Sequence, residues 1–69
     1  MEEMKLKALL NKLGCATEIR ILDTKLKVID EGYVFKILDK RYYDTELLDR
    51  NVVFITCYEK RIIDIIVEW

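Results

Sequence analysis

The sequence predicts a small α+β fold in which an N-terminal helix packs on a strongly bent antiparallel sheet of four or five strands. Three observations lead to this prediction. The chain starts with an amphipathic helical pattern, most of the remainder has a period of two, and the last segment, residues 61–69, is apolar on both faces of a strand. The 69 residues suffice for one domain, 1–69, near the lower size at which a hydrophobic core outweighs chain entropy.

A helix is predicted from residue 2 to residue 13. Four leucines recur at the spacing i, i+3, i+4 and i+7, so that they form one apolar stripe with lysines and an asparagine on the other side. Gly14 follows directly and is a common residue just after a helix end. The stripe, which we expect to lie on the sheet, consists of Leu6, Leu9, Leu10 and Leu13.

Alternation of polar and apolar residues begins after the helix and predicts strands. Residues 17–30 have the pattern of a β-hairpin. The segment Asp30–Gly32 interrupts the alternation and indicates a bend, and residues 33–38 then predict another strand. The pattern leaves open whether residues 26–38 form one bent strand or two.

The second half of the chain predicts a short helical turn and a closing hairpin. Residues 39–50 lack a strand period, and Asp44 or Thr45 can cap a single helical turn near residues 44–48. Residues 51–58 are rich in β-branched and aromatic side chains, and a tight turn connects them to the last strand. Because no long crossover helix separates the strands, we expect all of them to be antiparallel.

One helix can cover only one face of this sheet. A sheet of SH3-like type, or another small, partly open barrel, buries the apolar residues of the second face internally, whereas a flat sheet has to bury them against a second copy. We favour the bent sheet, leave open whether the chain is a monomer, a homodimer or a small homo-oligomer, and assign Ile62 and Ile66 to the self-association that either sheet allows. Trp69 shares the phase of the inward-facing residues of the last strand and is expected in the core. The residues expected on the second face are Leu22, Ile29, Phe54, Ile62 and Ile66.

The composition argues against an enzyme. Histidine and serine are absent, which removes the commonest general base and the Ser–His and Cys–His nucleophile pairs. Two cysteines are too few for a zinc site, and the two glycines form no phosphate-binding loop. We expect no catalytic residue, no metal and no cofactor, with Cys15 and Cys57 as free, buried thiols.

Charge and hydropathy indicate the surroundings in which the chain acts. Twelve basic and thirteen acidic residues give a net charge of −1, which does not attract a polyanion or an anionic membrane. No apolar run approaches the roughly 20 residues that span a bilayer, and the first residues are acidic where a secretory signal is basic. These features predict a cytoplasmic protein that does not insert into membranes.

One segment has the composition of a binding site. Lys40, Arg41, Tyr42 and Tyr43 place two cations beside two aromatic rings, and tyrosine and arginine are enriched in protein–protein interfaces. We assign Arg41, Tyr42 and Tyr43 to a protein partner, with exposed charges and rings that only cover the fold as the alternative. The same residues can hold single-stranded nucleic acid by stacking and phosphate contacts. The neighbouring acidic residues, which repel phosphates, disfavour that second function.

Several segments together resemble a loose class of small proteins without assigned roles, encoded by phages and prophages of low-GC Gram-positive bacteria. The resemblance is carried by the helix Leu6–Leu13, the strand Thr17–Ile21, the bend at Glu31 and Gly32, the entry Leu47–Val53 into a strand and the Ile-rich last strand. It implies a binding role toward a host or phage protein, in the cytoplasm of the host cell. It implies no functional residues.

Overall fold

The fold is α+β, as the sequence predicts. The computed structural model describes residues 4–59 and 61–69. The N-terminal helix is shorter than predicted and runs from Leu6 to Lys12, because Lys5 is extended and bridges Asn51; residues 2 and 3 of the predicted helix lie outside the described residues. The predicted helical turn near residues 44–48 is present. The elements in chain order are α1 (Leu6–Lys12), β1 (Glu18–Leu22), β2 (Val28–Tyr33), α2 (Val34–Lys40), α3 (Thr45–Leu48), β3 (Val52–Glu59) and β4 (Ile62–Val67).

The four strands form a mixed sheet in the order β2-β1-β4-β3. β2 pairs with β1 and β3 pairs with β4 in antiparallel fashion, as expected for hairpins. The expectation of a wholly antiparallel sheet is wrong at its centre, where β1 and β4 are parallel, with Glu18 opposite Ile62 and Leu22 opposite Ile66. The sheet therefore consists of two hairpins joined through their inner strands.

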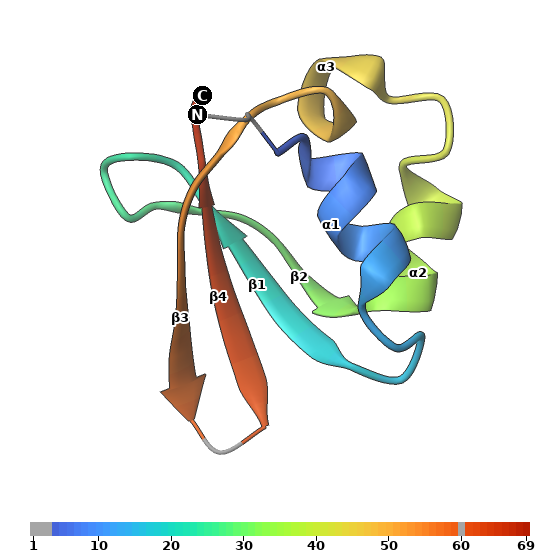
Figure 1. The fold of residues 1–69 in the computed structure, drawn as a ribbon, viewed down its shortest axis with the longest axis horizontal. Coiled ribbons are helices and arrows are strands. Elements are labelled where there is room, and N and C mark those ends of the chain that lie inside the picture. Colours follow the sequence, from blue (N-terminus) through green and yellow to red (C-terminus); the bar gives the residue numbers. More distant parts are fainter. Residues whose placement is uncertain (1–3, 60) are drawn as a thin grey trace.

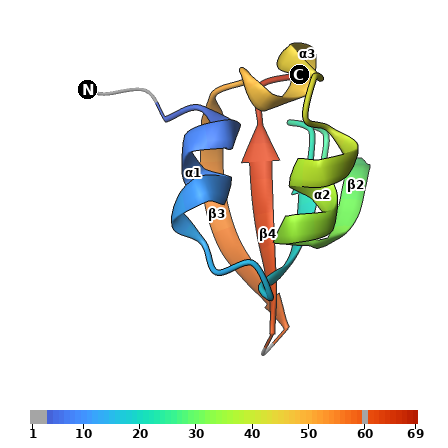
Figure 2. The ribbon, with the colours of Figure 1, turned by 90° about the vertical axis from the view of Figure 1, so that its right-hand side faces the viewer.

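All three helices lie on one side of the sheet (Figure 1). Seen from that side, α1 and α2 lie next to each other, with β4 visible between them (Figure 2). The sheet does not close into a barrel, since β2 and β3 remain its two edges. Consequently no helix of the described residues covers the face turned away from α1, α2 and α3, and we call it the open face.

The hydrophobic core fills the space between the helices and the sheet. The helical stripe of α1 supplies Leu6, Leu9 and Leu10, as predicted, and Leu47 and Leu48 of α3 close one end. The strands contribute alternate residues, because side chains of a strand point to opposite faces in turn. The buried strand and α2 residues of this cluster are Ile19, Ile21, Val34, Ile37, Ile65 and Val67.

The prediction of a strand over residues 33–38 is wrong, because the chain enters helix α2 at Val34. Neither α1 nor α2 has a side-chain cap. Instead, the first free N–H groups of α2 donate to the carbonyl oxygens of distant residues, from Val34 to Thr17 at 2.9 Å and from Phe35 to Cys15 at 3.2 Å. The question of residues 26–38 is thereby answered: a single strand is followed by a helix.

The turn from β2 into α2 depends on Gly32. Its φ of 140° lies in a region that residues with a Cβ atom rarely adopt. The bend predicted at Asp30–Gly32 therefore does not split a strand, but prepares the start of the helix one residue after Tyr33.

The core at the parallel centre of the sheet can be tested with a matched pair of isoleucines. Ile65 is fully buried, whereas its cross-strand neighbour Ile55 is 46% exposed. We expect Ile65→Val to lower the free energy of unfolding by roughly 0.5 to 1.5 kcal/mol, because a buried methyl group is lost and a small cavity remains. Ile55→Val should lower it by less than half as much. Urea unfolding followed by circular dichroism measures both, and equal losses would contradict the core described here.

Candidate interaction surface

The open face follows from the registers of the strands. Residues that lie opposite each other in paired strands share a face of the sheet. Ile19 and Ile21 of β1 point into the core, so their neighbours Glu18, Arg20 and Leu22 point to the open face. Through the registers with the other strands, the remaining members of the open face are Val28, Glu31, Tyr33, Phe54, Thr56, Ile62, Asp64 and Ile66.

An ion pair lies at the centre of the open face. The Arg20 guanidinium donates two hydrogen bonds to Asp64, each 2.9 Å long, from Nε to Oδ1 and from Nη2 to Oδ2. The side chains are only 22% and 11% exposed, and such bidentate geometry is the strong form of an arginine–carboxylate pair. Asp64 is therefore a buried charge with its partner in place on the neighbouring strand. A molecule that covers this face meets an ion pair that is already formed.

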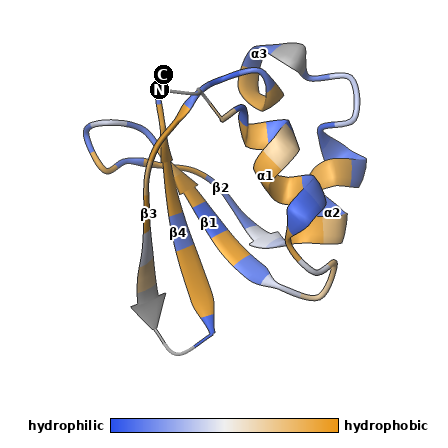
Figure 3. Ribbon diagram, viewed as in Figure 1, coloured by the Kyte–Doolittle hydropathy of each residue, from blue (hydrophilic) through white to orange (hydrophobic). Residues whose placement is uncertain are grey.

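The most exposed apolar stretch of the sheet lies on strand β3. Val53, Phe54 and Ile55 are 53%, 58% and 46% exposed, and the next two residues, Thr56 and Cys57, are exposed as well. None of these five residues carries a charge, and hydropathy colouring shows apolar residues along most of β4 and the first half of β3 (Figure 3). Soluble proteins usually protect an edge strand with charged residues, so an uncharged exposed edge marks a contact surface.

The beginning of the β3 edge is occupied by the N-terminal segment. The Val52 N–H donates to the Met4 carbonyl oxygen at 2.7 Å, and Lys5 forms an isolated antiparallel bridge with Asn51. From the same segment, the Leu6 N–H donates to the Arg50 carbonyl at 2.8 Å, which satisfies the start of α1. Beyond Val52, β4 is the one strand with which β3 pairs in the described part of the chain.

The predicted partner-binding residues lie together in the turn after α2. Tyr42 and Tyr43 are 66% and 89% exposed, and their rings meet edge to face with centroids 4.7 Å apart. Arg41 differs from them, because its guanidinium bonds Asp30 at 3.1 Å and Asp44 at 2.7 Å. These bonds raise the pKa of Arg41, with Asp44 as the larger cause. The two rings are therefore available to a partner, while Arg41 connects strand β2 to the start of α3.

The residues predicted for self-association, Ile62 and Ile66, lie on the open face and are half-buried. They occupy the inner strand β4, which lies between β1 and β3. Phe54, which lies opposite Ile66 on the edge strand, is more exposed than either. The apolar surface accessible to another molecule is thus displaced from the centre of the sheet toward β3.

Two other predictions are wrong. Trp69 lies outside the core with 51% of its surface exposed, and the Arg50 guanidinium stacks over its ring at 5.0 Å. Cys15 and Cys57 are free thiols, as expected, but both are exposed rather than buried. The alternation of side chains along the last strand predicted that Trp69 faces the core. Strand β4 ends at Val67, so Trp69 does not continue this alternation and its ring lies outside the core.

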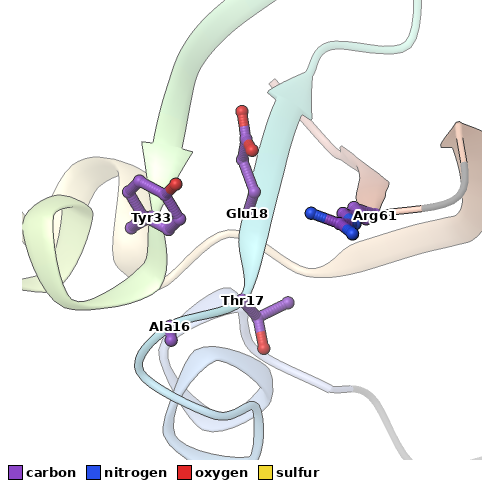
Figure 4. A pocket seen from close by; sticks show the side chains of 5 residues that line it. All are labelled: Ala16, Thr17, Glu18, Tyr33 and Arg61. Atoms are coloured by element: carbon purple, nitrogen blue, oxygen red, sulfur yellow. The ribbon is translucent and has the colours of Figure 1, made fainter.

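A shallow pocket of about 400 Å³ lies at one end of the open face, where β1 and β4 begin and β2 ends (Figure 4). Glu18 stands between Tyr33 and Arg61, which come from the segments on either side. One carboxylate beside one guanidinium does not make the pair of carboxylates that acid–base hydrolysis requires. The pocket is lined by Ala16, Thr17, Glu18, Tyr33 and Arg61.

The described residues bring together no group of three or more acidic or cysteine side chains that is able to hold a metal ion. Within the same residues, no helix has the length and apolar character needed to cross a membrane.

Comparisons with known proteins give no relative for this chain. No protein-family model, no curated protein and no solved structure matches it.

The carboxylate of Asp30 anchors β2 to the helices. Its side chain is 8% exposed and accepts hydrogen bonds from Lys40 at 2.9 Å and Arg41 at 3.1 Å. Burial acts to raise the pKa of Asp30, but the hydrogen bonds from Lys40, Arg41 and the Glu31 N–H outweigh it and lower the pKa below 3.8. A carboxyl group whose pKa falls on folding stabilises the fold above its ordinary pKa, and this stability is lost as the pH falls.

We expect Asp30→Asn to reduce the free energy of unfolding at neutral pH by roughly 1 to 3 kcal/mol, since Lys40 and Arg41 lose the negative charge and one of the two oxygens of their buried acceptor. The difference from wild type should shrink as the pH is lowered through the acidic range, because the wild-type carboxylate becomes protonated there. Urea unfolding at several pH values measures this, with Asp39→Asn on the exposed side of α2 as the control. A difference that stays constant down to the lowest pH would show that the Asp30 charge is not what stabilises the fold.

Proposed function

We propose that this protein is a non-enzymatic interaction module that binds a protein partner through strand β3 and the adjoining open face. The observation that supports it most strongly is the run of five exposed, uncharged residues from Val53 to Cys57 on an edge strand. A chain of 69 residues has little apolar surface to spare, since its own core needs most of it. Placing such residues at the surface costs stability, and a contact surface accounts for that cost.

The chemistry of this surface fits a protein better than a small molecule. An edge strand offers unpaired N–H and C=O groups to an extended segment, while the side chains on the two faces give selectivity. Phe54 supplies a large ring of the kind that anchors interfaces. The shallow pocket at Glu18 and Arg61, by contrast, lacks the enclosure with which proteins surround small ligands.

A second contact is proposed at the exposed ring pair Tyr42 and Tyr43. The rings need little ordering, because each is already held against the other. If the protein is encoded by a phage or prophage, the partner is a host or phage protein in the host cytoplasm. Arg41 contributes by fixing the turn between Asp30 and Asp44 rather than by reaching out to the partner.

The role of β3 in binding can be tested with two phenylalanines that have similar exposure. Phe54 is 58% exposed on β3, and Phe35 is 49% exposed on α2. Partners captured from the source cell are purified, and their affinity for wild type, Phe54→Lys and Phe35→Lys is measured by isothermal titration calorimetry. We expect Phe54→Lys to weaken binding roughly tenfold or more, as for an interface anchor, and Phe35→Lys to leave it within a factor of about three. Equal affinities of all three proteins would contradict the proposal.

Binding of single-stranded nucleic acid is the alternative function, and the ion pairs of Arg41 weigh against it. We expect no retention on immobilised single-stranded DNA or RNA even at low salt. A complex driven by phosphate contacts would be retained at low salt and released steeply as the salt concentration rises. Such retention, lost in Tyr42→Ala and Tyr43→Ala, would establish the alternative.

A further inference from the structure

We infer that strand β3 pairs in antiparallel fashion with β3 of a second copy of this chain, so that the two four-stranded sheets join into one. The inference rests on the proposed function, because it takes β3 as the contact surface. It adds that a second copy of this chain is the molecule that binds there. It is drawn from the position of β3 at the edge of the sheet, the exposure of Val53–Cys57 and the absence of a charged side chain from residues 52–57.

Among residues 4–59 and 61–69, β3 pairs beyond Val52 with β4 alone, and the occupant that an open sheet edge accepts is a strand. The N–H and C=O groups that β3 turns away from β4 need hydrogen-bond partners, and an added strand satisfies them in a regular array. At the start of the edge, the N-terminal segment already bonds in this way, with the Val52 N–H on the Met4 carbonyl at 2.7 Å. The register with β4 is regular from Phe54 to Cys57 and shifts on either side, so these four residues form the straight part of the edge.

The absence of charged side chains from residues 52–57 favours β3 of another copy as the added strand. Residues 52–57 contain no charged side chain, so two copies of this segment face each other without like-charge repulsion in the antiparallel registers that pair them with each other, away from Glu59 at the end of β3. The opposite edge of the sheet is unsuited to the same role. β2 carries the exposed Glu31 within its regular stretch and has Gly32 at a φ of 140°, and both discourage strand addition.

The side chains of β3 extend the contact to both faces of the joined sheet. Phe54 and Thr56 lie on the open face, and Ile55 and Cys57 lie on the side of the helices, as their partners in β4 show. A specific dimer buries about 800 Å² on each partner, which is roughly a sixth of the 5082 Å² that this chain exposes. Both the joined edge and the exposed side chains on the two faces contribute to this area.

The test is the mass of the purified chain in reducing buffer, by sedimentation velocity, from micromolar to near-millimolar concentration. We expect the mass to rise from one chain of 8.3 kDa toward two. Amide protons of Phe54–Cys57 that face away from β4 should exchange more slowly at the higher concentration. Thr56→Lys, a change at an exposed polar residue, should keep the chain monomeric, while Phe35→Lys should dimerise as wild type does.

A charge swap identifies self-pairing. Thr56→Lys and Thr56→Glu, each monomeric alone, should form a mixed dimer when combined, because position 56 of one strand lies close to position 56 of the other in pairings centred on the straight part of the edge. Because Asp64 lies opposite position 56 on the same face, circular dichroism first establishes that both variants are folded, and failure of the folded mixture to dimerise would overturn the inference. Dissociation by Ile62→Lys or Ile66→Lys, with Thr56→Lys still dimeric, would overturn it too and place the contact at the centre of the open face.

The outcomes separate this inference from the proposed function. If the wild-type chain stays monomeric at every concentration but Phe54→Lys weakens binding of a partner, β3 is the docking strand for a different protein and only the self-pairing is wrong. If the chain is monomeric and Phe54→Lys also leaves partner binding unchanged, both proposals fail.

Discussion

The structure depends on the parallel pairing of β1 with β4. These two strands are far apart in the sequence, and their five opposed residue pairs join two hairpins that would each be unstable alone. The pairing also sets the two faces of the sheet. Ile19, Ile21 and Ile65 turn toward the helices and form the core, while the Arg20–Asp64 ion pair turns the other way. Since α1, α2 and α3 all lie on the core side, the open face is covered, among the described residues, only by the side chains that the strands themselves project.

Local signals predicted the elements that are stabilised locally. The leucine spacing of α1, the tight hairpin of β3 and β4 and the Asp44 cap on the Leu47 N–H of α3 all involve residues close in sequence. Helix α2 was missed because its first N–H groups are satisfied by the carbonyls of Thr17 and Cys15, which leaves no capping residue in the sequence. The parallel centre was missed for the same kind of reason, because hairpin patterns carry no information on which strands of two hairpins meet.

The candidate sites show the same division between local and distant contacts. Composition was enough to find Tyr42 and Tyr43, which the structure exposes, and the ion pairs of Arg41 depend on Asp30, a residue brought near by the fold. The β-branched run that forms β3 was recognised as a strand, but its composition is that of a buried strand as much as of an exposed one. Its position at the edge follows from the strand order. A signal was nevertheless present, since no charge interrupts residues 51–58.

The two edges of the sheet are unequal, and this limits what self-pairing can produce. A chain with two receptive edges would add copies without end, as in fibres, whereas a chain with one receptive edge stops at two, because the two-fold pairing uses the same strand of both copies. Glu31 and Gly32 make the β2 edge unfavourable for the addition of another strand. The register shifts on either side of Phe54–Cys57 keep the straight part of β3 short. If two copies pair through β3 as inferred, the pairing covers the receptive edge of both copies and leaves the β2 edges, which carry Glu31.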